Sequence, residues 1–262
     1  MDVREPIIRV RNLVAAYGEN VILDGLNFDV NQGEIFVILG GSGCGKSTLL
    51  KHLIGLRDPR EGRVLIQGRD ITAAGGDERD TIMRGFGVMY QAGALFGSMT
   101  LLQNVSLPLE EFTQLPTQAV ESVARLKLAL VGLASAAELF PAEISGGMRK
   151  RAAIARAMAL DPEILFLDEP SAGLDPVTSA ELDQLIIRLS RTLGVTFVVV
   201  THELDSIYTI ADRIIMLDKR TKRIVAQGDP RELRDHADDP EMRRFFLRSA
   251  TEPAQAGTEE SS

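Results

Sequence analysis

The sequence has a single cysteine, no tryptophan and only 5% aromatic residues in a chain of 262 residues. One cysteine, Cys44, cannot form a disulfide within the chain, which fits a reducing compartment. The most apolar stretches, IFVIL and FVVV, are far shorter than the ~20 residues that span a bilayer. The N-terminal segment MDVREPIIRV contains Asp2 and Glu5 and lacks the long apolar stretch of a signal peptide. Work at a membrane would therefore require a partner that holds the chain there.

An excess of basic residues is also missing. The chain has 29 Lys and Arg against 37 Asp and Glu, for a net charge of -8. Nucleic-acid binders usually carry a basic excess, so no nucleic-acid partner is expected. A hydrophobic content of 45% is ample for a core, and the length fits one large domain or one domain with an inserted lobe.

Three short apolar runs predict buried strands. EIFVILGGSGCGKSTLLKHLIGL predicts a strand over 34–39, a glycine loop and a helix from Lys46. EILFLDEP predicts a second strand that ends at Asp168, and VTFVVVTHE predicts a third that ends near Thr201. Continuous apolar strands alternating with helices indicate an α/β fold with a mostly parallel sheet covered on both sides.

The segment between the last two strands, DPVTSAELDQLIIRLSRTLG, predicts a helix. Asp175 can cap it, Pro176 suits its first position and Gly194 follows its end. One face of this helix collects apolar residues at helical spacing: Val177, Leu182, Leu185, Ile186 and Leu189.

The chain divides into a core and an inserted lobe. Residues 93–159 have helical patterns and no buried strand, so we expect a helical subdomain there. The core is expected to comprise 1–92, with additional N-terminal strands in IIRVRNLVAAYG and NFDV, and 160–238. In 239–262, Asp239 and Pro240 favour a short helix with Met242, Phe245 and Phe246 on one face. The polar, acidic tail after it is expected to be disordered.

The glycine loop after the first strand is the strongest motif. GGSGCGKS matches G-x-x-x-x-G-K-[ST], in which backbone N–H groups cradle phosphates, Lys46 reaches the β- and γ-phosphates and Ser47 binds Mg²⁺. A chance glycine turn is disfavoured by the strand and helix on either side. Cys44 fits the loop as a small residue and is also a candidate for oxidative inhibition. The residues expected to bind ATP here are Gly40, Gly41, Ser42, Gly43, Cys44, Gly45, Lys46, Ser47 and Thr48.

Two carboxylates follow the second strand. Asp168 suits the Mg²⁺ shell, as strand-end acids do in P-loop NTPases, and Glu169 would face the γ-phosphate and polarise the attacking water. The alternative for an Asp-Glu-Pro sequence at a strand end is a plain turn without a catalytic role. The presence of the P-loop in the same chain disfavours this alternative.

A second anion cradle is predicted at EISGGMRKR. Ser145, Gly146 and Gly147 would place a hydroxyl and free N–H groups at a helix N-terminus. Three basic residues follow in the first turns (Arg149–Arg151), where the helix dipole disfavours cations. A nucleotide held by a second copy of the chain would supply the missing negative charge, whereas solvation or pairing with nearby acids is the alternative.

The chain resembles the ATP-binding-cassette (ABC) transporter ATPases over nearly its whole length. ISGGM resembles their signature motif and SAGLD, which ends at Asp175, their D-loop. His202 in VTHE resembles the switch histidine, Gln91 after FGVMY the Q-loop glutamine, and Tyr17 in AAYG the aromatic residue that stacks on adenine. The motifs also occur in the family's order, which makes the resemblance specific.

The resemblance implies roles for these residues. Glu169, His202 and Gln91 would be catalytic, and Ser47, Gln91 and Asp168 would hold Mg²⁺. Tyr17, Ser145, Gly146, Gly147 and Asp175 would join the loop residues in binding ATP. A core role for Tyr17 and a structural role for a lone histidine remain the alternatives.

Two stretches narrow the resemblance. Met148 stands where most members carry Gln, and SGGMRKR together with QAGALFGSMTLLQNVSLPLEEFTQLP, residues 91–116, resembles the MlaF-like subgroup that serves Mce-type phospholipid transport. That subgroup implies a homodimer at the cytoplasmic face of the bacterial inner membrane, with an MlaE-like permease and an MlaD-like Mce-domain lipid-binding protein. A small MlaB-like STAS subunit is a further partner in such systems. The alternatives are an amino-acid or metal transporter and a soluble, non-transport cassette ATPase.

Overall fold

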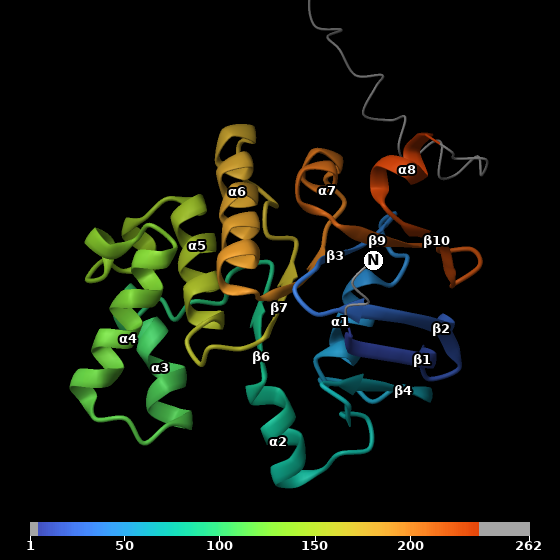
Figure 1. Ribbon diagram of the computed structural model, residues 1–262, viewed down its shortest axis with the longest axis horizontal. Helices are drawn as coiled ribbons and strands as arrows, with labels where there is room; N and C mark the ends of the chain where they lie inside the picture. The colour runs from blue at the N-terminus through green and yellow to red at the C-terminus, as the bar shows by residue number, and fades with distance from the viewer. Residues whose placement is uncertain (1–4, 236–262) are drawn as a thin grey trace, which may run out of the picture.

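The computed structural model describes residues 5–235 and arranges them as two sheets, their helices and a helical lobe (Figure 1). The strands are β1 Pro6–Tyr17, β2 Asn20–Asn31, β3 Ile35–Gly40, β4 Glu61–Ile66, β5 Arg69–Asp70, β6 Phe86–Met89, β7 Ile164–Asp168, β8 Thr196–Val200, β9 Arg213–Leu217 and β10 Ile224–Gly228. The helices are α1 Lys46–Leu53, α2 Gly76–Arg84, α3 Leu101–Phe112, α4 Thr117–Leu130, α5 Gly146–Ala157, α6 Pro176–Leu193, α7 Leu204–Ile210 and α8 Pro230–Asp235, with 3-10 turns at Ala134–Ala136 and Pro141–Glu143. In this described range, no helix has both the length and the apolar character needed to cross a membrane.

The larger sheet has the strand order β10-β9-β3-β8-β7-β6. Its strands are parallel except for β10, which pairs antiparallel with β9. Every residue of β3 and β8 is buried, as expected for parallel strands covered on both faces. The prediction of an α/β fold with a mostly parallel sheet is therefore confirmed. Because the strands are parallel, the loops after β3, β6, β7 and β8 all leave the same edge.

The smaller sheet is antiparallel, with the order β2-β1-β4-β5. Its two N-terminal strands confirm the additional strands expected from IIRVRNLVAAYG and NFDV. Apolar residues of β1 and β2 share one core cluster with residues of α1. This sheet therefore packs against the helix that follows the glycine loop, as Figure 1 shows at its right-hand side.

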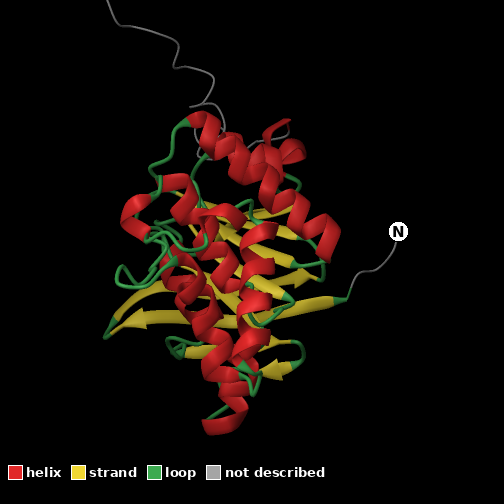
Figure 2. Cartoon of the chain, turned by 90° about the vertical axis from the view of Figure 1, so that its left-hand side faces the viewer, coloured by secondary structure: helices red, strands yellow, loops and turns green. Residues whose placement is uncertain are grey.

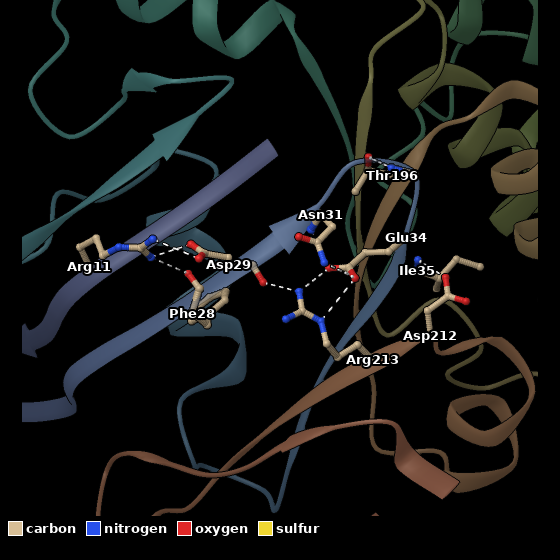
Figure 3. A network of polar contacts seen from close by, with 10 residues as sticks. Arg11, Phe28, Asp29, Asn31, Glu34, Ile35, Thr196, Asp212 and Arg213 are labelled. Carbon is tan, nitrogen blue, oxygen red and sulfur yellow. Dashed lines mark hydrogen bonds and ion pairs between the residues drawn. The ribbon is translucent and has the colours of Figure 1, made fainter. Parts of the chain in front are cut away.

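An ion pair at the start of β3, together with a hydrogen bond from its arginine to β2, links the two sheets (Figure 3). Glu34, directly before β3, is 5% exposed, and Arg213 of β9 donates to both of its carboxylate oxygens, at 2.7 and 3.3 Å. The same guanidinium donates to the Asp29 carbonyl of β2 at 2.6 Å, and the Asn31 N–H donates to Glu34 at 2.7 Å. These bonds lie at the start of β3, at the opposite end from the glycine loop.

The predicted helical lobe is formed by α3, α4 and α5. Between the end of β6 and the start of β7 the structure has helices and turns but no strand. Viewed from the side of the lobe, helices lie in front of the strands (Figure 2). The lobe meets the core closely at Gly87 of β6, where a Cβ atom would come within 2.7 Å of the Ala157 carbonyl carbon of α5.

Helix α6 begins and ends as predicted. Asp175 is its N-cap, Pro176 its first residue and Gly194, at φ 70°, its C-cap. Leu182, Leu185, Ile186 and Leu189 are buried, but Val177 is 70% exposed, so its predicted place on the buried face is wrong. The helix has 18 residues against five in β7, so it is longer than the sheet it covers. Val177 lies in the first turn, beyond the core.

Some predictions concern residues outside the described range. The expected helix with Met242, Phe245 and Phe246, and the acidic tail, lie in 236–262 and are not described. The boundaries 1–92, 93–159 and 160–238 remain predictions, although β6 ends before the first of them and β7 begins after the second.

Candidate nucleotide-binding site

The glycine loop joins β3 to α1 through backbone that glycine alone adopts easily. Gly40 has φ 148°, and a Cβ atom there would lie 2.5 Å from the Leu217 carbonyl oxygen. Gly45, the N-cap of α1, has φ 104°. Lys46 Nζ donates to the carbonyls of Gly40, at 2.8 Å, and Gly41, at 3.4 Å. The loop therefore places an ammonium group and a helix N-terminus together, the two features that bind phosphate groups.

A hollow of about 750 Å³ opens over this loop. It brings together most of the predicted site: Gly40, Gly41, Ser42, Gly43, Gly45, Lys46, Ser47, Thr48, Gln91, Glu169 and His202. Ile22 and Leu204 also line it and were not predicted, because an apolar residue has no motif to mark it. Their positions depend on how β2 and α7 pack beside the loop, which the local sequence does not encode.

Glu169 is held in an unusual backbone conformation. Its φ is 47°, a left-handed value that costs energy for a residue with a side chain. The Glu169 N–H donates to the Val200 carbonyl at 2.8 Å, which fixes the turn after β7. The carboxylate is almost buried and lies 2.9 and 3.0 Å from His202 Nδ1. Strain of this kind, with a Glu–His pair facing a hollow, is typical of a functional site.

Asp168 is suited to a cation. Burial, followed by the charge of Glu169, raises the pKa of Asp168, while the charge of Lys46 opposes this. Its Oδ1 atom is buried and has no hydrogen-bond partner among the described residues. A buried carboxylate oxygen without a partner is costly unless a cation or water completes it.

The remaining Mg²⁺ candidates have the right chemistry. The Ser47 hydroxyl and the Gln91 amide line the hollow, and oxygen donors of these kinds suit Mg²⁺. Within residues 5–235 there is no group of three or more His, Cys, Asp or Glu side chains that could hold a metal. The predicted ligands Ser47, Gln91 and Asp168 include one carboxylate. Such a set fits Mg²⁺ that takes its other ligands from phosphate and water.

Tyr17 and Cys44 are among the predicted ATP-binding residues that do not line the hollow. Tyr17 is 41% exposed, and the Arg57 guanidinium lies 4.2 Å from its ring centroid. The Cys44 thiol is buried in the core cluster with α1, and burial raises its pKa. A buried, protonated thiol reacts slowly, so the suggestion of oxidative inhibition at Cys44 is not supported.

The second cradle is a separate place on the chain. Ser145 is the N-cap of α5, and its Oγ accepts from the Met148 N–H at 3.2 Å. Ser145 is exposed, whereas Gly147 is buried against Thr178 of α6, so that a Cβ at Gly147 would overlap the Thr178 Cγ2 methyl. None of the three cradle residues lines the hollow over the glycine loop. As predicted, one chain does not bring its two cradles together.

Two of the three basic residues that follow Ser145, Arg149 and Lys150, have partners in their own chain. Arg149 Nη1 donates to the Ile144 carbonyl at 2.9 Å. Lys150 is 8% exposed, and its Nζ donates to the carbonyls of Gln91 and Glu169. For Lys150 the structure therefore favours the alternative of partners in its own chain, although these partners are backbone carbonyls and not acids. Sequence spacing did not reveal this, since Lys150 and Gln91 are distant along the chain.

Asp175 acts as a helix cap. Its Oδ1 accepts from the N–H groups of Val177 and Thr178, and its Oδ2 accepts from the Thr178 hydroxyl at 2.5 Å. The hydrogen bond from that hydroxyl is the main reason that the pKa of Asp175 is lowered. Asp175 does not line the hollow, so its role in ATP binding remains a prediction.

His202 also lines a second hollow of about 510 Å³, and Asp183, Glu203 and Asp205 are among the other residues that line it. Asp183 of α6 is 4% exposed. Burial raises the pKa of Asp183 to about 6; the charges of Glu203 and Asp205 add to the rise, and a hydrogen bond from Ser206 opposes it.

Replacing Asp183 with Asn is expected to stabilise the protein above pH 6 and to change little near pH 4. The folded chain keeps the Asp183 proton up to a pKa of about 6, whereas the unfolded chain loses it near 3.8. The free energy of unfolding therefore falls as the pH rises between these values, by at most about 3 kcal/mol, and Asn removes that cost. Thermal unfolding at about pH 4 and about pH 8 tests this, with Asp80→Asn, an exposed aspartate on α2, as the control. An equal loss of stability at both pH values would contradict it.

Comparisons with known proteins agree with this geometry. Residues 23–172 match the profile of the family described as "ABC transporter". The chain is 44% identical over 239 residues to the "Probable ribonucleotide transport ATP-binding protein mkl" of Mycobacterium leprae, covering 91% of this chain and 68% of that one. It is 40% identical over 240 residues to the "Intermembrane phospholipid transport system ATP-binding protein MlaF" of Escherichia coli, covering 92% and 88%. The dimeric ATP-binding cassette MJ0796, solved with ADP and Pi in a post-hydrolysis state, superimposes with a TM-score of 0.77 at 32% identity, covering 85% and 98%.

Proposed function

We infer that this chain, which belongs to the ABC transporter family of ATPases, hydrolyses ATP to energise phospholipid transport between membranes. The observation that carries the proposal is the Glu169–His202 pair, which faces the glycine loop across one hollow. That arrangement places a carboxylate base opposite the groups that bind phosphate.

The glycine loop holds the nucleotide in this proposal. Loop N–H groups and Lys46 bind the phosphates, and Tyr17 stacks on adenine. Ser47, Gln91 and Asp168 would hold Mg²⁺, which supplies positive charge to the β- and γ-phosphates when bound. The unpartnered Asp168 Oδ1 and the oxygens of Ser47 and Gln91 support this assignment.

Glu169 orients and deprotonates the attacking water. His202 Nδ1 lies within hydrogen-bond distance of both Glu169 oxygens, so a proton on Nδ1 is donated to the carboxylate and fixes its plane. A lone pair on that carboxylate then remains available to the water proton. Lys46 counters the charge that develops on the γ-phosphate.

A second copy completes the site. Ser145 and Gly146 lie at the start of α5 and do not line the hollow over their own glycine loop. A head-to-tail homodimer would bring the Ser145 cradle of each copy to the nucleotide held by the other. The dimeric state of the structural neighbour MJ0796 supports this arrangement.

The permease is proposed to dock where the lobe meets the core. A hollow of about 340 Å³ lies between α2, β6, α3 and α5, and is lined by Asp80, Met83, Arg84, Phe86, Gly87, Val88, Pro108, Phe112, Arg156, Ala157 and Leu160. Phe96, Phe112 and Leu115 nearby in sequence are 50%, 51% and 44% exposed. Apolar exposure around a groove suits a helix-in-groove contact with a membrane partner.

The names of the relatives differ in cargo, ribonucleotide for mkl and phospholipid for MlaF. The phospholipid assignment is supported by the resemblance of residues 91–116, of which Pro108 and Phe112 line the proposed permease groove. It implies an MlaE-like permease, an MlaD-like Mce-domain protein and an MlaB-like STAS subunit, at the cytoplasmic face of the bacterial inner membrane.

The test is gentle purification of the tagged chain from its own membranes, with proteins and small molecules identified by mass spectrometry. We expect a multispanning permease, an Mce-domain protein and bound phospholipid. A permease with a solute-binding protein and no lipid would overturn the phospholipid assignment and leave the ATPase. Recovery without any membrane protein would overturn the transport function.

A further inference from the structure

Lys150 occupies a position that the proposed hydrolysis mechanism does not use. It lies on α5, whose N-cap is Ser145, and it is 8% exposed. Its Nζ donates to the Gln91 carbonyl at 2.6 Å and to the Glu169 carbonyl at 3.1 Å. An ammonium between two carbonyls forms charge-assisted hydrogen bonds, which are stronger than neutral ones.

The two carbonyls belong to different loops of the site. Gln91 follows β6 and Glu169 follows β7, and these strands are parallel neighbours with Met89 paired to Leu167. Lys150 reaches both loops from the helical lobe. Its one side chain therefore fixes the backbone of two residues that face the glycine loop.

Burial and the nearby carboxylates act in opposite directions on the charge of Lys150. Burial lowers the pKa of Lys150, while the charges of Glu169, Glu203 and Asp168 oppose the lowering. The only hydrogen bonds that its Nζ makes within the described chain are to the two carbonyls. It therefore acts on the backbone of Glu169 and not on its carboxylate, which pairs with His202.

We propose that Lys150 is a positioning residue that couples the Ser145 end of α5 to Glu169 and Gln91 of the same chain. This inference rests on the proposed function, in which Ser145 contacts the nucleotide of the second copy. A helix moves as one unit, so a shift of Ser145 on engaging that nucleotide is transmitted through Lys150 to the hydrolysis site of its own chain. Lys150 thereby links the two ATP sites of the dimer.

The tests use Lys150→Met, which keeps the length and removes the donors, and Lys150→Arg, which restores them. Lys127→Met is the matched control, because Lys127 is a second lysine buried in the lobe, at 4% exposed, and its partner Asp161 lies away from the hollow. ATP hydrolysis by the full-length chain gives kcat, KM and the Hill coefficient, and thermal unfolding gives stability.

For Lys150→Met we expect kcat to fall by about 10- to 100-fold, with KM within about twofold and a Hill coefficient near one, because misplacement of catalytic groups by about 1 Å has costs of this size. Lys150→Arg should recover part of kcat and of the cooperativity, and Lys127→Met should lower the Tm but leave the Hill coefficient unchanged.

Three results would overturn the coupling: Lys150→Met with normal kcat and Hill coefficient, Lys150→Arg no better than Met, or the same kinetic defect in Lys127→Met. If Lys150→Met does not fold, Lys150→Arg is compared with wild type instead. The coupling then predicts a Hill coefficient for Lys150→Arg that is lower than in wild type but above one. Wild type and Glu169→Gln are measured in the same assay. Absence of ATPase activity in wild type would reject the proposed function itself, which separates the two failures.

Discussion

Replacing Glu169 with Gln is expected to lower kcat for ATP by about 10²- to 10⁴-fold, the usual contribution of a general base. Gln keeps the size and a hydrogen bond to His202 but cannot accept the water proton. ATP binding should persist, because the glycine loop and Lys46 are unchanged. Steady-state hydrolysis and binding of labelled ATP measure the two effects, and light scattering should reveal a lasting ATP-dependent dimer.

Glu163→Gln is the control for this substitution, because Glu163 precedes β7 and lies at the opposite end of that strand from Glu169. It should hydrolyse ATP normally. Near-normal turnover in Glu169→Gln would remove Glu169 from the role of base. Loss of ATP binding would instead place Glu169 among the residues that hold the nucleotide.

Replacing Gly147 with Ala is expected to destabilise the protein by about 1–3 kcal/mol, as overpacking usually does, and to abolish most of the ATPase activity. The new Cβ would overlap the Thr178 Cγ2 methyl of α6. Relief of that overlap must move the start of α5, and with it the Ser145 cradle, away from α6. Thermal unfolding and ATP hydrolysis measure the two losses.

A second substitution tests the cause. Thr178→Ser removes the methyl but keeps the hydroxyl that donates to Asp175, so Gly147→Ala with Thr178→Ser should recover stability and activity. Gly146→Ala is the control for stability, because its Cβ would meet Leu174 at an ordinary 3.5 Å. Failure of the double variant to recover, or a Gly147→Ala protein as stable as wild type, would contradict the packing argument.

The sequence predicted the elements whose causes are local. The glycine loop, the strand that ends at Asp168 and the caps of α6 at Asp175 and Gly194 all depend on residues next to one another in the chain. The position of Val177 did not follow from helical spacing, because periodicity gives the face of a helix but not how far the sheet beneath it extends.

The parts of the site that sequence could not predict depend on long-range packing. The sequence left open whether the charge of Lys150 is matched by a second copy's nucleotide or by groups of its own chain. Its actual partners, the carbonyls of Gln91 and Glu169, are set by how α5 packs against the edge of the sheet. Ile22 and Leu204 line the hollow for a similar reason, since their place depends on the arrangement of β2 and α7.

The most direct test of the shared ATP site mixes two disabled chains. One carries Lys46→Ala and the other Ser145→Arg, and both carry Glu169→Gln so that ATP is bound but not hydrolysed. Only a mixed dimer contains a site with an intact glycine loop from one chain and an intact Ser145 cradle from the other. Light scattering with ATP should therefore show monomers for each variant alone and dimers for the mixture. A mixture that stays monomeric, or Ser145→Arg that dimerises fully by itself, would contradict the account.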